Sequence, residues 1–231
     1  MSLRSLFLSL FLLASACAIS QERGAMAKFN YGIKAGFHAV TYDDPSFNID
    51  GYRFDKNCIH SNKIGYTITP FARVTYKRFY LQTEAVLGIT HHSFDFLDSN
   101  TTDEGFEPNS TVYNLKTYCA QIPLLFGYNF VDQKLFAMSF FTGPKAKFIF
   151  TAHSEQEFIH FNDSSLKEVL KKNCYYWEFG LGVKIDKVFF DFVYDLGLSD
   201  ASQYIISNRK GNIYSTSRRD NVLSFSVGMI F

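Results

Sequence analysis

Six histidines are the residues of this chain best suited to hold a metal ion or to move a proton. They are His38, His60, His91, His92, His153 and His160. Imidazole nitrogens bind transition metals when several of them converge, often with a thiolate or a carboxylate. None of the six shows close ligand spacing with cysteine or carboxylate, and His91 and His92 would point to opposite faces of an extended strand. The sequence therefore predicts no metal site and no cofactor, and polar loop positions are the expected role of these histidines.

Nine charged residues recur on the polar face of alternating segments, where paired charges would do structural work. They are Lys34, Arg73, Glu84, Lys145, Lys147, Glu178, Lys184, Asp191 and Asp195. Five are cationic and four are anionic, so they can largely neutralise one another. A packed, self-neutralising polar core is the main expectation, and a narrow path for ions or solutes is the alternative.

The first residues resemble a targeting signal. Arg4 supplies a positive charge, residues 6–13 (LFLSLFLL) are apolar, and residues 14–16 (ASA) fit a small-x-small cleavage site. No later stretch reaches the roughly 18 apolar residues of a membrane helix. We therefore expect residues 1–20 to be a signal peptide and residues 21–231 to form one exported domain.

The cysteines leave alternatives open. Cys17 is either part of the discarded signal or the acylated first residue of a lipoprotein. Cys58, Cys119 and Cys174 are an odd number in an oxidising compartment, so at least one thiol is unpaired within the chain. Cys58 and Cys174 are expected near one rim, where they form a disulfide or remain independent. Cys119 is expected to point inward as a free thiol.

Eight segments alternate between apolar and polar or small residues, as strands with two different faces do. They span about 29–38, 64–76, 79–89, 118–129, 136–150, 175–185, 190–198 and 222–231. In the last segment Leu223, Phe225 and Val227 share one face, and Ser224 and Ser226 share the other. Pro70, Pro123 and Pro144 would each remove a ladder donor, so bulges or strand ends are expected there.

The connections between these segments also alternate. Short turns are expected at 77–78, 131–134 and 186–187, and long polar loops at about 41–62, 92–111, 151–172 and 199–220. Strands of about 10 to 14 residues suit a tilted crossing of a bilayer. The sequence therefore predicts an all-β fold, an eight-stranded antiparallel up-and-down transmembrane β-barrel with apolar residues toward lipid and charges inside. A soluble barrel or sandwich would expose the charged face instead.

Several short stretches resemble a known family. Residues 118–128 (YCAQIPLLFGY) are similar to the "IPLL" strand of the PorT-like outer-membrane β-barrel proteins of Bacteroidota. Gly143-Pro144, residues 179–183 (FGLGV) and residues 189–198 are similar to later parts of that pattern. The resemblance covers about residues 28–231 and implies a location in a bacterial outer membrane. One branch of the family is associated with protein export and gliding machinery. The terminal Phe231 resembles the aromatic insertion signal of outer-membrane barrels.

The main functional hypothesis is non-enzymatic: a structural or interaction role in the cell envelope, accessory to protein secretion, carried by the extracellular loops. Expected partners are outer-membrane lipid and lipopolysaccharide, the barrel-insertion machinery and an envelope or secretion-system protein. The net charge of +1 gives no reason to expect nucleic acid. One alternative is an enzyme acting on lipid A through His91, His92 and Ser93, although no G-x-S-x-G motif is present. Others are a barrel binding small solutes at its outer rim and a secreted calyx for a lipophilic ligand.

Overall fold

A computed structural model describes residues 27–46, 48–49, 52–54, 64–98, 110–157, 166–207, 213–215 and 217–231. The strands are β1 (Lys28–Ser46), β2 (Asn48–Ile49), β3 (Tyr52–Phe54), β4 (Gly65–Tyr76), β5 (Phe79–Glu84), β6 (Val86–Asp98), β7 (Ser110–Asp132), β8 (Phe136–Glu157), β9 (Leu166–Leu170), β10 (Asn173–Ile185), β11 (Val188–Gly197), β12 (Ser202–Ser207), β13 (Ile213–Ser215) and β14 (Ser217–Ile230). No described helix has the length and apolar character needed to cross a membrane.

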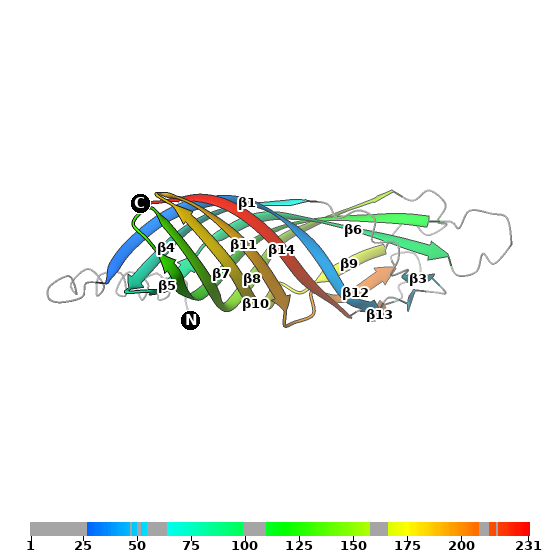
Figure 1. Cartoon of the computed structure of the whole chain (residues 1–231). Helices are drawn as coiled ribbons and strands as arrows, with labels where there is room; N and C mark the ends of the chain where they lie inside the picture. Colours follow the sequence, from blue (N-terminus) through cyan, green and yellow to red (C-terminus); the bar gives the residue numbers. More distant parts are fainter. Residues whose placement is uncertain are drawn as a thin grey trace.

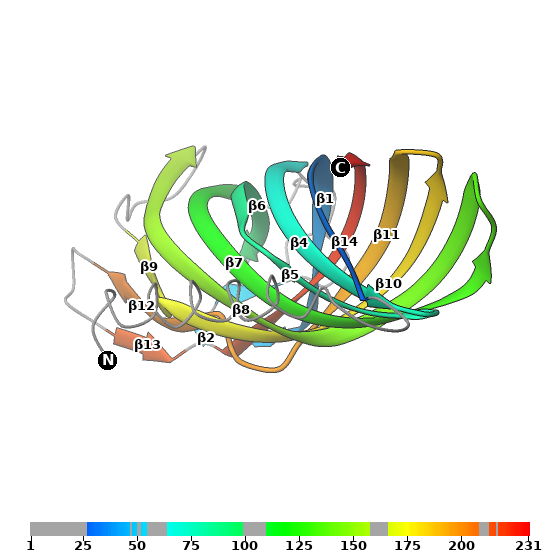
Figure 2. The same cartoon turned by 90° about the vertical axis from the view of Figure 1, so that its left-hand side faces the viewer.

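The strands form a closed antiparallel ring. Its order is β1, β4, the β5–β6 pair, β7, β8, β10, β11 and β14, and β14 pairs back with β1. The closing pair runs from Gly32↔Ile230 to Asp43↔Arg219 before its register shifts, and β1 and β14 lie side by side in Figure 2. Closure leaves the membrane-level sheet without an unpaired edge, which lipid could not satisfy. The predicted eight-stranded all-β barrel is confirmed.

The two faces of the ring follow the predicted alternation. Along β10 (Asn173–Ile185), exposed and buried residues alternate from Asn173 to Gly182, and Trp177, Phe179 and Leu181 point outward. The same period of two holds in β5 and through most of β11 and β14. The outer face is therefore apolar and aromatic, while small and charged residues face the lumen.

The prolines affect the ladder at only one level of the barrel. Pro70 lies opposite Ala85, the residue that separates β5 from β6, and Pro123 lies on the other neighbouring strand at the same height. The pairing register is the same on both sides of this break. The strand opposite Pro70 is therefore divided at Ala85 into β5 and β6, because a proline has no N–H to donate to it, but no extra residue is inserted. Pro144 lies inside β8 opposite Trp177 without the expected bulge or strand end, although the β7–β8 ladder is interrupted beside it, between Pro123↔Lys145 and Phe126↔Thr142.

Tight turns close one end of the ring. Lys77 and Arg78 connect β4 to β5, residues 133–135 connect β7 to β8, and Asp186 and Lys187 connect β10 to β11. Lys77 and Asp186 both have a φ of 54°. Two-residue hairpins require a positive φ because only such turns match the twist of the flanking strands. The C-terminus lies at this same end (Figure 1).

The opposite end differs from the prediction of long loops. Residues 92–98 and 110–117 continue as strands β6 and β7, and residues 151–157 continue β8. β7 and β8 are 23 and 22 residues long, and they extend far past the ring in Figure 1. Hydrogen bonding continues there, so these segments are strands and not loops. A second small sheet, β13-β12-β9, also lies at this end.

The predicted signal peptide, residues 1–20, and Cys17 lie outside the described residues. The domain limit at residue 21 therefore remains a prediction.

Candidate functional site

The first buried group in the lumen is centred on Lys34 of β1. Its Nζ donates to Glu84 Oε1 at 2.7 Å and to Asp191 Oδ2 at 3.0 Å. The three side chains are 2 to 6% exposed. Glu84 belongs to β5 and Asp191 to β11, each two strands away around the ring. This triad therefore ties opposite flanks of the closing strand together through the interior.

The second buried group is centred on Lys145 of β8. Its Nζ lies 3.0 Å from Glu178 Oε2 and 2.5 Å from Asp195 Oδ2. These side chains are also 2 to 6% exposed. A buried ion costs several kcal/mol when unpaired, so two carboxylates around one ammonium are tolerated only because the contacts are direct. Asp195 Oδ1 is a buried oxygen without a hydrogen-bond partner, and a small cavity of about 50 Å³ lies beside this group.

The remaining charged residues of the predicted set occupy different depths. Arg73 Nε donates to Gln82 Oε1 at 2.5 Å, and Gln82 Nε2 donates to Glu84 Oε1 at 2.5 Å, so Arg73 is linked to the first triad. Lys147 is buried, with its Nζ 5.9 Å from the centre of the Tyr176 ring. Lys184 lies near the short-turn end, where it lines an open cavity with Arg73.

Aromatic side chains fill the lumen between these charges, and each lies on a glycine of the neighbouring strand. Four cross-strand pairs show this arrangement: Phe71 with Gly32, Tyr80 with Gly127, Phe141 with Gly180, and Phe189 with Gly228. A Cβ added to any of these glycines would lie 2.0 to 2.5 Å from a ring atom or the facing backbone. Glycine therefore makes the space that lets a large ring fold flat against the barrel wall.

Sequence alternation alone does not predict this packing, because Phe71, Phe141 and Phe189 are bulky residues on the inner face. Tyr80, Leu125, Phe141 and Val193 form one buried cluster, in which Leu125 is 0% exposed. Tyr80 Oη also donates to Ser139 Oγ at 3.2 Å. The signal was available: an aromatic residue on an inner-face position directly opposite a glycine. Using it required the strand register.

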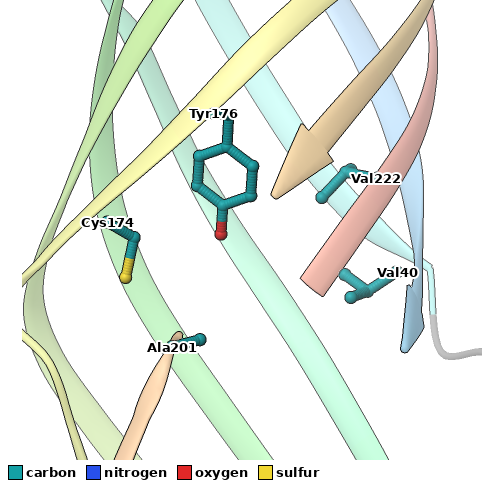
Figure 3. Close-up of a cluster of buried hydrophobic side chains, with 5 residues drawn as sticks. All are labelled: Val40, Cys174, Tyr176, Ala201 and Val222. Carbon is teal, nitrogen blue, oxygen red and sulfur yellow. The ribbon is translucent and has the colours of Figure 1, made fainter. Parts of the chain in front are cut away.

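A separate apolar cluster closes the lumen toward the long-strand end. Val40 of β1, Cys174 and Tyr176 of β10, Val222 of β14 and Ala201 form it, and Figure 3 shows their side chains gathered inside the ring. All five are at most 8% exposed. These five side chains are therefore shielded from solvent.

The histidines and cysteines do not converge on a site in the described part of the chain. His38 is buried, with Nε2 3.1 Å from Thr90 Oγ1, and His91 Nδ1 lies 3.1 Å from the Ile64 carbonyl oxygen. No cluster of three metal-ligating side chains occurs among the described residues. His60 and His160 lie outside these residues, and so do the side chains of His92, Ser93 and His153.

The predicted disulfide involves Cys58, which lies outside the described residues, so it stays a prediction. Its proposed partner Cys174 is buried, and its Sγ lies 3.8 Å from the Lys171 carbonyl oxygen. Cys119 points inward and carries a free thiol, whose Sγ lies 3.7 Å from the Gly88 carbonyl oxygen.

Phe231 closes the ring at the short-turn end. Its backbone N–H donates to the Tyr31 carbonyl at 2.7 Å, and its ring centre lies 5.8 Å from that of Tyr31. The side chain faces outward and is 54% exposed. Its role as a C-terminal insertion signal stays a prediction.

Three solved structures of other proteins are similar to this chain. The outer membrane protein OprG from Pseudomonas aeruginosa is similar over 89% of this chain and 97% of its own, with a TM-score of 0.53 and 13% identity. Ail from Yersinia pestis matches with a TM-score of 0.39 and 11% identity, covering 88% of this chain and 99% of its own. The transport unit of the autotransporter AIDA-I from Escherichia coli matches with a TM-score of 0.36 and 10% identity, covering 94% and 96%. No curated protein matches.

The family model decides the assignment. The model described as "Outer membrane protein beta-barrel domain" matches residues 19–203, most of the chain. Its match agrees with the closed ring, the apolar outer face and the charged interior. The protein is therefore located in the bacterial outer membrane. In barrels of this kind the short turns face the periplasm and the long connections face the outside of the cell, and we infer the same orientation here. The chain belongs to the outer membrane protein beta-barrel domain family.

Proposed function

We propose that this protein is a closed, non-enzymatic barrel that anchors an extracellular β-structure for binding another envelope protein. The observation that carries the proposal is the long β7–β8 ladder, which runs from Asp132↔Ala137 at the periplasmic turn to Val112↔Glu157, with register shifts at Asn129/Val131 and Tyr118/Cys119. A tilted strand crosses the hydrocarbon core in about 9 to 11 residues. A strand of 23 residues therefore has roughly half of its length available outside the membrane.

The side chains that pack the middle of the lumen support a binding role over transport. Two ion-pair groups, an aromatic layer and an apolar cluster occupy the lumen, and members of both ion-pair groups line one small cavity. Eight-stranded barrels have an interior that side chains can fill completely. The outward apolar face anchors the protein in lipid, and the extended strands reach through the lipopolysaccharide layer. The similarity to PorT-like proteins supports a partner in the protein-export apparatus.

The test removes the extension and keeps the barrel. Replacing residues 92–115 by a two-residue Asn-Gly turn shortens the β6–β7 hairpin at the His92↔Leu115 pair. Partners cross-linked to the intact protein in living cells should be lost from this variant, while a variant with only residues 208–212 replaced should retain them. Equal partner recovery from both variants would overturn the proposal. Both proteins should give no unitary current steps in planar bilayers, and steady conductance would argue for transport instead.

A further inference from the structure

The periplasmic end of the lumen contains an open cavity of about 350 Å³. Inner-face residues of the barrel wall line it, together with residues at the short-turn rim. Its charged lining consists of Lys28, Arg73, Lys77, Lys184, Asp132 and Asp191. Cavities of this volume hold small-molecule ligands in many proteins. We call this cavity the periplasmic vestibule.

The vestibule carries an excess of positive charge. Four of its lining residues are cations and two are acids. Asp191 is 2% exposed and is already bound to Lys34, so its charge is largely neutralised from the other side. Among the described residues, no carboxylate lies within ion-pair distance of Lys28, Arg73, Lys77 or Lys184. Among the described residues, the cations of the lining are therefore not balanced by acidic partners.

Arg73 is held in a fixed position within this lining. Its Nε donates to Gln82 Oε1, and its guanidinium carbon lies 4.2 Å from the centre of the Tyr80 ring. Stacking and one hydrogen bond orient the planar group and leave its terminal N–H donors for another acceptor. A guanidinium in a fixed plane is suited to the paired oxygens of carboxylate or phosphate. Neutral side chains of Asn30, Asn129 and Ser139 add further polar groups around it.

We propose that the periplasmic vestibule binds a small soluble polyanion with phosphate or carboxylate oxygens. The ligand enters from the periplasm and stops at the aromatic layer, where Phe189 lines the cavity and Tyr80 and Phe141 fill the lumen beyond. The barrel wall separates the vestibule from the bilayer. A soluble anion therefore has direct access, whereas a lipid headgroup would have to pass around the rim.

The experiment titrates the full mature chain, folded in zwitterionic detergent, with inorganic pyrophosphate and with citrate by isothermal titration calorimetry. Arg73→Gln and Lys184→Gln alter the vestibule. Arg78→Gln and Lys187→Gln make the same changes in the adjacent turns, outside its lining. The emission of Trp177, the only tryptophan, reports folding of each variant. A loss of one charge-assisted contact should raise Kd by about tenfold or more in the vestibule variants and less than about twofold in the rim variants.

Saturable binding of either probe with this difference between variants supports the proposal. Absence of saturable binding, or an equal loss in the rim variants, overturns it. If Arg73→Gln does not fold, Lys184→Gln against Lys187→Gln decides alone. A lipid source is tested by repeating the titration in nanodiscs of phosphatidylcholine with and without phosphatidylglycerol. Loss of pyrophosphate binding only with phosphatidylglycerol would overturn the assignment of a soluble ligand. None of these outcomes depends on the extracellular role proposed above.

Discussion

Lys34 and Lys184 both face the lumen, yet they lie in opposite electrostatic surroundings. Lys34 is 6% exposed and has two carboxylates within 3.0 Å. Lys184 is half-buried at the periplasmic vestibule, and no described carboxylate pairs with it. Water explains the difference, because a solvated ammonium needs no protein partner whereas a buried one does. Charges at the centre are therefore committed to the fold, and those in the vestibule remain available to a ligand.

The aromatic layer only partly separates these two regions, because Asp191 pairs with Lys34 and also lines the periplasmic vestibule. Phe71 and Phe189 pack edge to face with ring centres 5.2 Å apart, and Tyr80 and Phe141 belong to the same buried level. Excluding water here strengthens the ion pairs beyond it, because Coulomb interactions grow as the local dielectric falls. The comparison predicts that equal substitutions on the two sides of this layer have very unequal effects.

The largest effect is expected for Lys34→Met. This change leaves Glu84 and Asp191 buried without their shared cation, which should lower the free energy of unfolding by about 3 to 5 kcal/mol. The measurement is urea-induced unfolding in phosphatidylcholine vesicles, followed by Trp177 emission and by the heat-modifiable gel mobility of the folded barrel. The triple variant Lys34→Met with Glu84→Gln and Asp191→Asn should recover part of the loss. A single variant as stable as the wild type would contradict the structural role of the triad.

A smaller effect is expected at the aromatic layer. Gly180→Ala would place a Cβ 2.2 Å from the Phe141 ring, so the ring must move. Overpacking of this kind costs about 1 to 3 kcal/mol. The same unfolding experiment measures it, and Phe141→Leu in the Gly180→Ala background should relieve the clash. Additive losses in the double variant would show that the two residues do not share the space.

The barrel was predictable from sequence because lipid and lumen impose different chemistry on alternate residues. Leu223, Phe225 and Val227 face outward and Ser224 and Ser226 face inward, as the alternation predicted. The extension of β6, β7 and β8 was not predictable in the same way. These segments are rich in polar residues such as His92, Ser93 and Asn114, so their sequence reads as polar loops.

The sequence predicts which kinds of side chain face the lumen. It does not predict which of them contact one another. The charged residues were expected to meet one another, but Lys34 reaches Glu84 across β4 and Asp191 across β14. Such contacts depend on the relative height of strands that are not neighbours. Phe141 resting on Gly180 likewise depends on register. Alternation alone fixes the face of a residue and leaves its height unknown.

Phe231→Ala should separate assembly from stability. The ring is outward-facing and touches Tyr31, so its removal should cost about 1 kcal/mol or less of unfolding free energy. If the ring is read by the insertion machinery, the folded fraction in outer membranes of living cells should fall severalfold. A conservative Phe231→Tyr variant should restore it. A stability loss large enough to explain the assembly defect would remove the need for a signal.

The smallest effect is expected for Lys184→Met, which makes the same chemical change as Lys34→Met on the solvated side of the aromatic layer. No described carboxylate loses a partner, so the free energy of unfolding should stay within about 0.5 kcal/mol of the wild type. The same vesicle experiment measures both variants side by side. A loss approaching that of Lys34→Met would mean that the vestibule charges stabilise the fold, and that solvation does not separate the two regions as argued.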